Sequence, residues 1–185
     1  MPINNAQELF VHNLSEIYDA EHQFVEGQQE MAQQASDQNL RSAIEEHIGQ
    51  TEQHARNLEG VFEQLGQQPQ RATNEVAQGL VSEAQQVMQE AQDENLRDCA
   101  INAAVIKVEH FEMGSYRGLV TAAQQMGQDE IVNLLQQNLQ QEEQTAQVAE
   151  NRAKGLLQKA MQAEKGEQQE DKGLIEQAKD KLTGR

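Results

Sequence analysis

Apolar side chains recur along most of the chain at alternating spacings of three and four residues, which is typical of amphipathic helices that share a core. The pattern predicts four long helices. They run from about Asn5 to Ala35, from a cap at Ser36 or Asp37 to near Gly66, from about Glu94 to Met126, and after Gly127 to about Ala163. A shorter amphipathic stretch, from about Asn74 to Ala91, separates the second long helix from the third.

The connections between these helices indicate the fold class. Two are short turns, and the third contains the 74–91 stretch, which is long enough to carry the chain from one end of a bundle to the other. The sequence therefore predicts an all-α, ferritin-like antiparallel four-helix bundle with a long crossover that contains an additional shorter helix. We expect this domain to span residues 1–163. Residues 164–185 are charged and punctuated by glycine, so we expect a mobile C-terminal tail with one helical turn around Leu174 to Leu182.

Polar residues interrupt the apolar seam of each long helix. Burying an unpaired carboxylate is costly, so a carboxylate in a seam pairs with another group, changes its pKa or binds a metal ion. The interrupting residues are Glu21 in the first long helix, His47, Thr51 and His54 in the second, Glu109 and Glu112 in the third, and Asn138, Glu142 and Thr145 in the fourth.

Counting from the turns places these residues at one height in the bundle. Glu21 and Thr51 each lie 15 residues from Ser36 in the first predicted turn, and Glu112 and Glu142 each lie 15 residues from the second turn. At 1.5 Å per residue, each of these positions is about 22 Å from its turn. We therefore expect all four long helices to direct polar groups at one level of the core.

An internal regularity supports this convergence. The separation between Glu21 and His54 is 33 residues, and so is the separation between Glu109 and Glu142. Both Glu21 and Glu109 are also followed directly by a histidine. Two related hairpins would place the four residues around a pseudo-twofold axis, which is how dinuclear carboxylate sites are built in helical bundles.

Composition and charge narrow the functional class. The chain has 185 residues, with 32 glutamines and only two prolines, which favours long helices. Its formal net charge of −17 argues against binding nucleic acid or an anionic membrane surface. A single cysteine, Cys99, the absence of a signal-peptide pattern and the absence of a membrane-length apolar run together predict a cytoplasmic protein.

Four segments carry a resemblance to a known family. They are Leu14–Glu21 (LSEIYDAE), His47–Thr51 (HIGQT), Lys107–Tyr116 (KVEHFEMGSY) and Leu134–Thr145 (LLQQNLQQEEQT). These segments resemble the ferritin-like stress proteins typified by YciE and YciF, and the likeness covers roughly residues 5–160. The resemblance implies a ferritin-like bundle with an extra connecting helix, a homodimer and a rubrerythrin-like di-iron site. The biochemical activity of that family is poorly defined.

The candidate ligands depart from the full ferritin pattern. The second long helix has Thr51-x-x-His54 and the fourth has Glu142-x-x-Thr145 where Glu-x-x-His is expected. A second glutamate one turn after Glu109 can compensate, because positions i and i+3 share a helix face. The expected metal ligands are Glu21, His54, Glu109, Glu112 and Glu142. Carboxylates with imidazole suit iron or manganese, so the expected cofactor is two Fe ions, or two Mn ions, per chain.

Six further residues are candidates for additional ligands or for side chains that support the ligands. They are His47, Thr51, Thr145, His110, Tyr18 and Tyr116. His47 lies one heptad from His54 and is either a ligand or a hydrogen-bond partner of Glu21 or Asn138. For the two tyrosines, packing is the alternative to a role at the site.

Three functions are consistent with the sequence. The leading hypothesis is a stress-response protein whose dinuclear centre has peroxide-reducing or ferroxidase-like activity, with peroxide or dioxygen as the oxidant. The alternative is a non-enzymatic structural protein whose polar core is vestigial and holds no metal. A third hypothesis, a partner adaptor, predicts an exposed apolar stripe on the 74–91 helix.

Overall fold

The computed structural model describes the backbone of residues 3–183 and the side chains of residues 3–166. It contains five helices: α1 (Ala6–Gln34), α2 (Gln38–Gln64), α3 (Glu75–Glu90), α4 (Glu94–Gln125) and α5 (Asp129–Thr183). No strand occurs in the described backbone. The predicted all-α fold class is confirmed.

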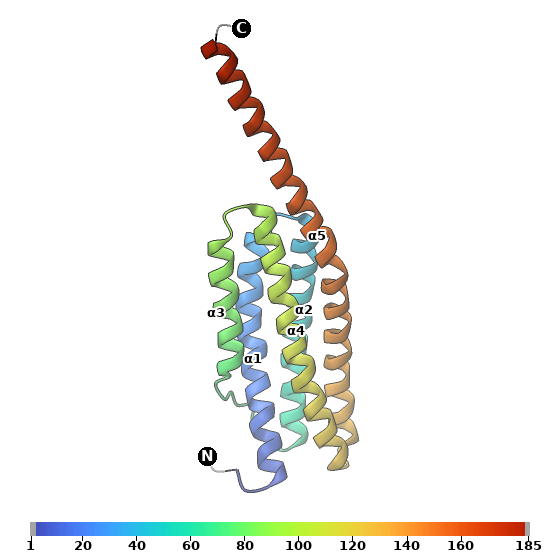
Figure 1. Cartoon of the computed structure of the whole chain (residues 1–185). Helices are drawn as coiled ribbons and strands as arrows, with labels where there is room; N and C mark the ends of the chain where they lie inside the picture. The colour runs from blue at the N-terminus through green and yellow to red at the C-terminus, as the bar shows by residue number, and fades with distance from the viewer. Residues whose placement is uncertain (1–2, 184–185) are drawn as a thin grey trace.

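The four long helices form an antiparallel bundle of two hairpins (Figure 1). One hairpin is α1 with α2 and the other is α4 with α5, and the hairpins meet where α1 packs on α4 and α2 packs on α5. Helix α3 lies outside this bundle against α1 and α4, and it carries the chain from the end of α2 to the start of α4 at the opposite end. This is the predicted crossover.

Side-chain caps fix the helix starts close to their predicted positions. Asn5, Asp37, Asn74 and Asp93 each accept a hydrogen bond from a backbone N–H in the first turn of the following helix. The sequence A-x-D-x-N-L-R occurs twice, at 35–41 and 91–97, and the arginine at its end donates to the carbonyl of the alanine at its start each time. This repeat builds two sharp turns at the same end of the bundle.

Two glycines end helices at the opposite end. Gly66 and Gly127 have φ values of +68° and +67°, in the left-handed region that glycine adopts without a steric penalty. In both turns the glycine N–H and the N–H that follows it bond back to carbonyls of the last helical turn, which is a Schellman motif. The Gly127 turn fixes the starting height of α5 against α4.

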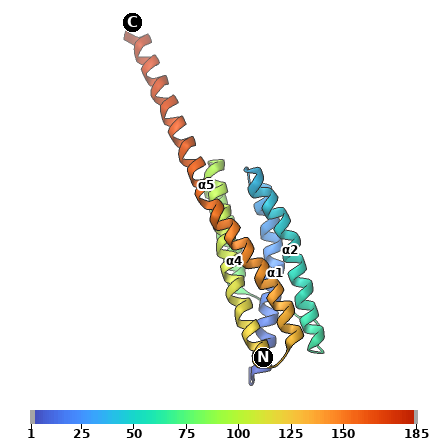
Figure 2. The ribbon, with the colours of Figure 1, turned by 90° about the vertical axis from the view of Figure 1, so that its right-hand side faces the viewer.

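Helix α5 is longer than predicted. Its predicted end near Ala163 is wrong, because the helix continues to Thr183 and projects beyond the bundle (Figure 2). The glutamine, glutamate, lysine and alanine of residues 164–183 favour helix strongly enough to outweigh two glycines, each of which costs about 1 kcal/mol. The helical turn predicted around Leu174 to Leu182 is part of α5, and the side chains there lie outside the described residues. The division at residue 163 and the mobility of the tail stay predictions.

The apolar core is divided into two clusters. One is built around Phe10, Phe24 and Phe62, and the other around Met31, Leu40 and Ile101. The polar seam residues occupy the level between the two clusters. The fold therefore holds a buried polar layer at mid-height, where the sequence places its carboxylates and imidazoles.

Candidate metal centre

Six ionisable side chains from all four long helices meet in the polar layer. None is more than 4% exposed. They are Glu21 of α1, His47 and His54 of α2, Glu109 and Glu112 of α4, and Glu142 of α5. The structure thus brings together all five predicted ligands and adds His47, which the sequence offered only as an additional ligand.

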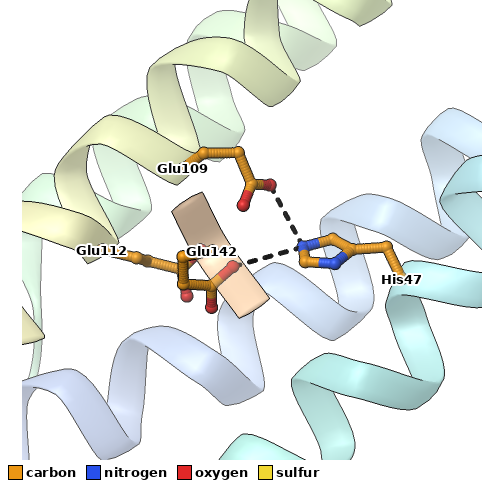
Figure 3. Close-up of side chains that lie close together, drawn as sticks. All are labelled: His47, Glu109, Glu112 and Glu142. Carbon is orange, nitrogen blue, oxygen red and sulfur yellow. Dashed lines mark ion pairs between the residues drawn. The ribbon is translucent and has the colours of Figure 1, made fainter. Parts of the chain in front are cut away.

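Four of these residues form what we call the His47 cluster: His47, Glu109, Glu112 and Glu142 (Figure 3). One donor atom from each lies within 4.8 Å of the others. The Nε2 atom of His47 is 3.1 Å from Oε1 of Glu109 and 3.8 Å from Oε2 of Glu142. Donor atoms on opposite sides of a first-row metal ion are about 4 Å apart, since each bond is about 2.0–2.2 Å, so the cluster is close to ion-binding dimensions.

Three residues form the neighbouring His54 cluster: Glu21, His54 and Glu142. The Nδ1 atom of His54 is 2.7 Å from Oε1 of Glu142 and 3.7 Å from Oε2 of Glu21. Glu142 belongs to both clusters, and its two oxygens face different histidines. A carboxylate in this position can bridge two ions.

The donor atoms of both clusters lack ordinary hydrogen bonds. Among the described residues, no hydrogen-bond partner is found for either carboxylate oxygen of Glu109, Glu112 or Glu142. The same holds for Oε2 of Glu21 and for the ring nitrogens of the two histidines that face the carboxylates. Buried polar atoms are normally satisfied, so this concentration of unsatisfied atoms indicates that another group completes the site.

The opposite nitrogen of each imidazole is held by a glutamine. The Nδ1 atom of His47 is 3.0 Å from Oε1 of Gln50, and Nε2 of His54 is 2.8 Å from Oε1 of Gln141. A ring N–H that donates to an amide oxygen leaves the lone pair of the other nitrogen directed at the carboxylates. Histidines that bind metals are typically oriented in this way.

The charge of the site matches two divalent cations. Its four carboxylates carry four negative charges when they are ionised, and two divalent ions would neutralise them with both imidazoles neutral. Oxygen-rich sites with imidazole suit iron and manganese better than metals that prefer thiolates. The residues present therefore fit the predicted pair of ions.

Without a cation, the carboxyl groups of the polar layer have displaced pKa values. Burial raises the pKa of Glu109 to about 8, against the opposing positive charge of the His47 imidazole 3.1 Å away. Burial, followed by the charges of Glu142, Glu21 and Glu109, raises the pKa of Glu112 well above its ordinary value. Burial also raises the pKa of Glu21. Burial therefore favours the neutral form of each of these carboxyl groups, whereas a metal-bound carboxylate is ionised.

Glu142 and the two histidines are displaced so as to favour ion pairs. Burial would raise the pKa of Glu142, but the positive charge of the His54 imidazole, 2.7 Å away, outweighs burial and lowers the pKa. Burial disfavours the imidazolium form of His47, but Glu109 outweighs burial and raises the pKa to about 9. For His54, the negative charges of Glu142 at 2.7 Å and of Glu21 at 3.7 Å overcome burial in the same way and raise the pKa to about 10. Protons on the imidazoles thus partly replace the missing cation charge.

Three of the additional candidates adjoin the clusters. The Tyr116 hydroxyl donates to Oε1 of Glu21 and accepts from Asn138 at 3.0 Å. Thr145 Oγ1 is 3.3 Å from Nδ1 of His47. Thr51 donates to Oε1 of the buried Gln28 at 3.2 Å.

The other two candidates lie elsewhere. Tyr18 donates its hydroxyl hydrogen to Glu59 at 2.8 Å and packs on Phe62. His110 is exposed and lies 3.4 Å from Glu150, so the prediction that it supports the site is wrong. The expected partners of His47 are also wrong, because its ring contacts Glu109, Gln50 and Thr145 instead of Glu21 or Asn138. A histidine one position after a seam residue points about 100° away from the seam, which explains the position of His110.

Gln28, Gln50 and Gln141 were missed as supporting residues. The chain has 32 glutamines, and nothing in the sequence marks these three apart from their spacing. Gln50 and Gln141 lie three residues after His47 and one residue before Glu142, and either position could have signalled a role beside a ligand.

The comparisons with known proteins agree with this architecture. The family described as Domain of unknown function (DUF892) matches residues 5–162. The chain belongs to this family. It is 32% identical over 146 residues to Protein YciF of Escherichia coli strain K12, covering 78% of this chain and 88% of YciF. The predicted membership of the YciF-like ferritin-like stress proteins is thereby confirmed.

Two solved structures of similar proteins share the fold of this DUF892 member. The E. coli stress protein YciF superposes with a TM-score of 0.81 at 29% identity, covering 85% of this chain and 99% of YciF. YcfI of Rhodopseudomonas palustris, described as a candidate structural protein, superposes with a TM-score of 0.79 at 32% identity, covering 80% of this chain and 94% of YcfI. The matches establish the fold and the stress-protein family.

Proposed function

We propose that the protein binds two iron or manganese ions, one in each cluster, and that the pair reduces peroxide or dioxygen. The observation that carries this proposal is the position of Glu142, whose two oxygens face two different histidines. Each of those oxygens lacks a hydrogen bond, as do the donor atoms that surround them. A shared carboxylate between two sets of unsatisfied donors is the arrangement that a dinuclear centre requires.

The residues of the chain give such a centre its properties. When bound, two reduced ions supply the two electrons that, with two protons, convert one hydrogen peroxide to two waters. Burial of all six side chains excludes bulk water, and the Tyr116 hydrogen bond fixes one oxygen of Glu21. Glu109 and Glu112 must lose their protons to act as ligands, so metal affinity falls as the pH is lowered.

The alternative is a stress protein with a metal-free polar core. The ion pairs between His47 and Glu109 and between His54 and Glu142 favour it, because they compensate part of the buried charge without a cation. That arrangement still leaves both oxygens of Glu112 without a hydrogen bond. The two functions therefore differ in what Glu112 requires.

Metal analysis tests the proposal directly. Protein from cells grown with added iron or manganese should carry close to two ions per chain, and anaerobic titration of metal-free protein with Fe(II) or Mn(II) should saturate at two. Glu142→Gln keeps the size of the side chain but removes the shared charge. The His54 cluster then keeps one carboxylate and the His47 cluster two, so binding should fall from two ions to about one per chain. The matched control is Glu143→Gln, at the next position of α5, where the carboxylate pairs with Arg117 on the surface.

Two results would contradict the proposal. If wild-type protein binds neither ion, and its unfolding temperature does not change when Fe(II) or Mn(II) is added, the polar core is structural. Equal binding by wild type and Glu142→Gln would exclude the shared-ligand arrangement. For protein loaded with two Fe(II) ions, one equivalent of hydrogen peroxide should oxidise both.

The remaining predictions concern membrane association, oligomeric state and cellular location. No described helix is both long and apolar enough to cross a membrane. A homodimer and a cytoplasmic location stay predictions.

Of the large apolar side chains on α3, only Val76 and Val87, near its two ends, are exposed. That separation gives little support to the adaptor hypothesis, which requires a continuous stripe.

A further inference from the structure

A cavity of about 200 Å³ opens beside the His47 cluster. Side chains from α1, α2, α4 and α5 line it, and His47 and Thr145 are among them. Of the six cluster residues, His47 is the one that lines this cavity. Because Nδ1 of His47 faces Gln50 and Thr145 while Nε2 faces Glu109, the imidazole ring separates the cavity from the carboxylates.

Thr145 explains why space exists at this position. It lies three residues after Glu142, where the ferritin pattern has a histidine that completes the ligand set. Threonine is smaller than histidine and its hydroxyl donates to the Gln141 carbonyl of its own helix at 3.1 Å. One side of the His47 cluster is consequently bordered by a cavity instead of a ligand.

The charges around the cavity argue against a route for metal ions. Arg152 lines it, is half-buried and makes no hydrogen bond or close ion pair with the described residues. Asp37, whose charge reaches Arg152, is itself paired with Lys159 at 3.5 Å. The other charged residue of the lining, Glu46, is exposed. An uncompensated guanidinium repels a divalent cation but can donate hydrogen bonds to a neutral or anionic ligand.

The walls and the size argue for an organic ligand. Ile44, Val105, Val148 and Ala149 give the cavity apolar walls, whereas His47 and Thr145 provide polar groups beside the cluster. The volume of about 200 Å³ is several times the roughly 30 Å³ that one water molecule occupies. Hydrogen peroxide, which is polar throughout, gains nothing from apolar walls. Sites for drug-sized molecules are larger, at about 300–1,000 Å³.

We propose that this cavity binds small alkyl hydroperoxides and holds them against His47, at the edge of the His47 cluster. The alkyl group packs on the apolar walls, and the hydroperoxy group reaches Thr145 and His47. This assignment of the oxidant class rests on the proposed function, but binding in the cavity does not require a metal. The two ideas can therefore fail separately.

The first test uses metal-free protein and tert-butyl alcohol, the unreactive alcohol that corresponds to tert-butyl hydroperoxide. We expect saturable shifts in the NMR signals of the His47 ring and the Thr145 methyl group, with a Kd in the millimolar range for so small a ligand. Val148→Trp, which fills the cavity from its rim, should weaken binding at least tenfold. The matched control is Leu157→Trp, because the two residues are 51% and 52% exposed on the same helix and Leu157 does not line the cavity.

The second test uses metal-loaded protein and compares two oxidants. Val148→Trp should slow the consumption of tert-butyl hydroperoxide at least tenfold and that of hydrogen peroxide much less, and Leu157→Trp should slow neither. Failure of the alcohol to bind folded wild-type protein, or equal binding by wild type and Val148→Trp, overturns the inference. Alcohol binding by a protein that binds no metal supports the cavity and overturns the dinuclear function and, with it, the hydroperoxide assignment.

Discussion

The His47 and His54 clusters share Glu142 but are unequal. The His47 cluster has three carboxylates and borders a cavity, whereas the His54 cluster has two carboxylates, and the Tyr116 hydroxyl donates to one of them. The internal repeat predicts equivalent halves, with Glu21 related to Glu109. His54 corresponds to Glu142 in this repeat, and two further residues, His47 and Glu112, have no related ligand in the other half. Both of these belong to the same cluster. The departure from symmetry thus gives one cluster a third carboxylate and a neighbouring cavity.

The largest expected effect comes from changing the number of carboxylates in each cluster. Wild type should bind Mn(II) in two steps, with the His47 cluster filled first, because three carboxylates attract a cation more strongly than two. Glu21→Gln leaves the His54 cluster with one carboxylate, and binding there should weaken more than 100-fold, beyond the 10–100-fold typical of supporting residues. Calorimetric titration should then give one ion per chain.

Glu112→Gln is the complementary change. It gives the His47 cluster two carboxylates and one imidazole, which is the composition of the His54 cluster. The two binding steps should merge into one, with two ions still bound per chain. Two well-separated steps in this variant would contradict the view that carboxylate number sets the difference between the clusters.

A smaller effect is expected from the glutamines that hold the imidazoles. Gln141→Leu should weaken binding in the His54 cluster by about 10–100-fold and leave the His47 cluster unchanged, and Gln50→Leu should do the reverse. The same titration measures both variants, so each serves as the control for the other. Equal effects of either variant on both clusters would show that the sites act as one unit.

The pH dependence of stability gives a third comparison, between protein with and without metal. Glu109, His47 and His54 have pKa values raised to about 8, 9 and 10 in the folded state, so the unfolded chain loses these protons at lower pH. Their contribution is therefore present at acidic pH and lost as the pH rises through those values. The melting temperature of metal-free protein should fall between pH 6 and pH 9, and bound metal should reverse this trend. A melting temperature that rises over this range without metal would contradict the assigned protonation.

The smallest effects should come from the residues that lie away from both clusters. Tyr18→Phe removes the hydrogen bond to Glu59 and should cost about 0.5–1.5 kcal/mol of stability without changing metal binding. His110→Ala removes an exposed imidazole and should change neither stability nor binding measurably. Urea unfolding and metal titration check both variants, and loss of an ion in either would return that residue to the site.

Most of the fold could be predicted because it depends on local signals. Asn5, Asp37, Asn74 and Asp93 cap helices where the hydrophobic pattern begins, and glycine ends two of them. The end of α5 could not be predicted in the same way. Residues 164–173 carry no apolar side chain, and helix without an apolar seam is set by propensity alone, which is a weak signal.

The site was predictable as far as seam positions determine it. A carboxylate such as Glu109 must face the core because its helix turns every 3.6 residues, so counting places it correctly. Partners of the imidazoles depend on side-chain rotamers, which counting does not provide. Gln50 and Gln141 contact the histidines through such rotamers, and their positions near His47 and Glu142 in the sequence do not determine these contacts.

The division of the apolar core into two clusters has a consequence for the cooperativity of the helix bundle. With ions bound in the polar layer, the metal–ligand bonds would join the two apolar clusters into a single cooperative unit. Without ions, the polar layer should be the least stable level of the core. Amide protons near Glu109 and Glu142 should therefore exchange with deuterium faster than those at Phe62 or Ile101. Metal binding should then stabilise the polar layer and slow this exchange.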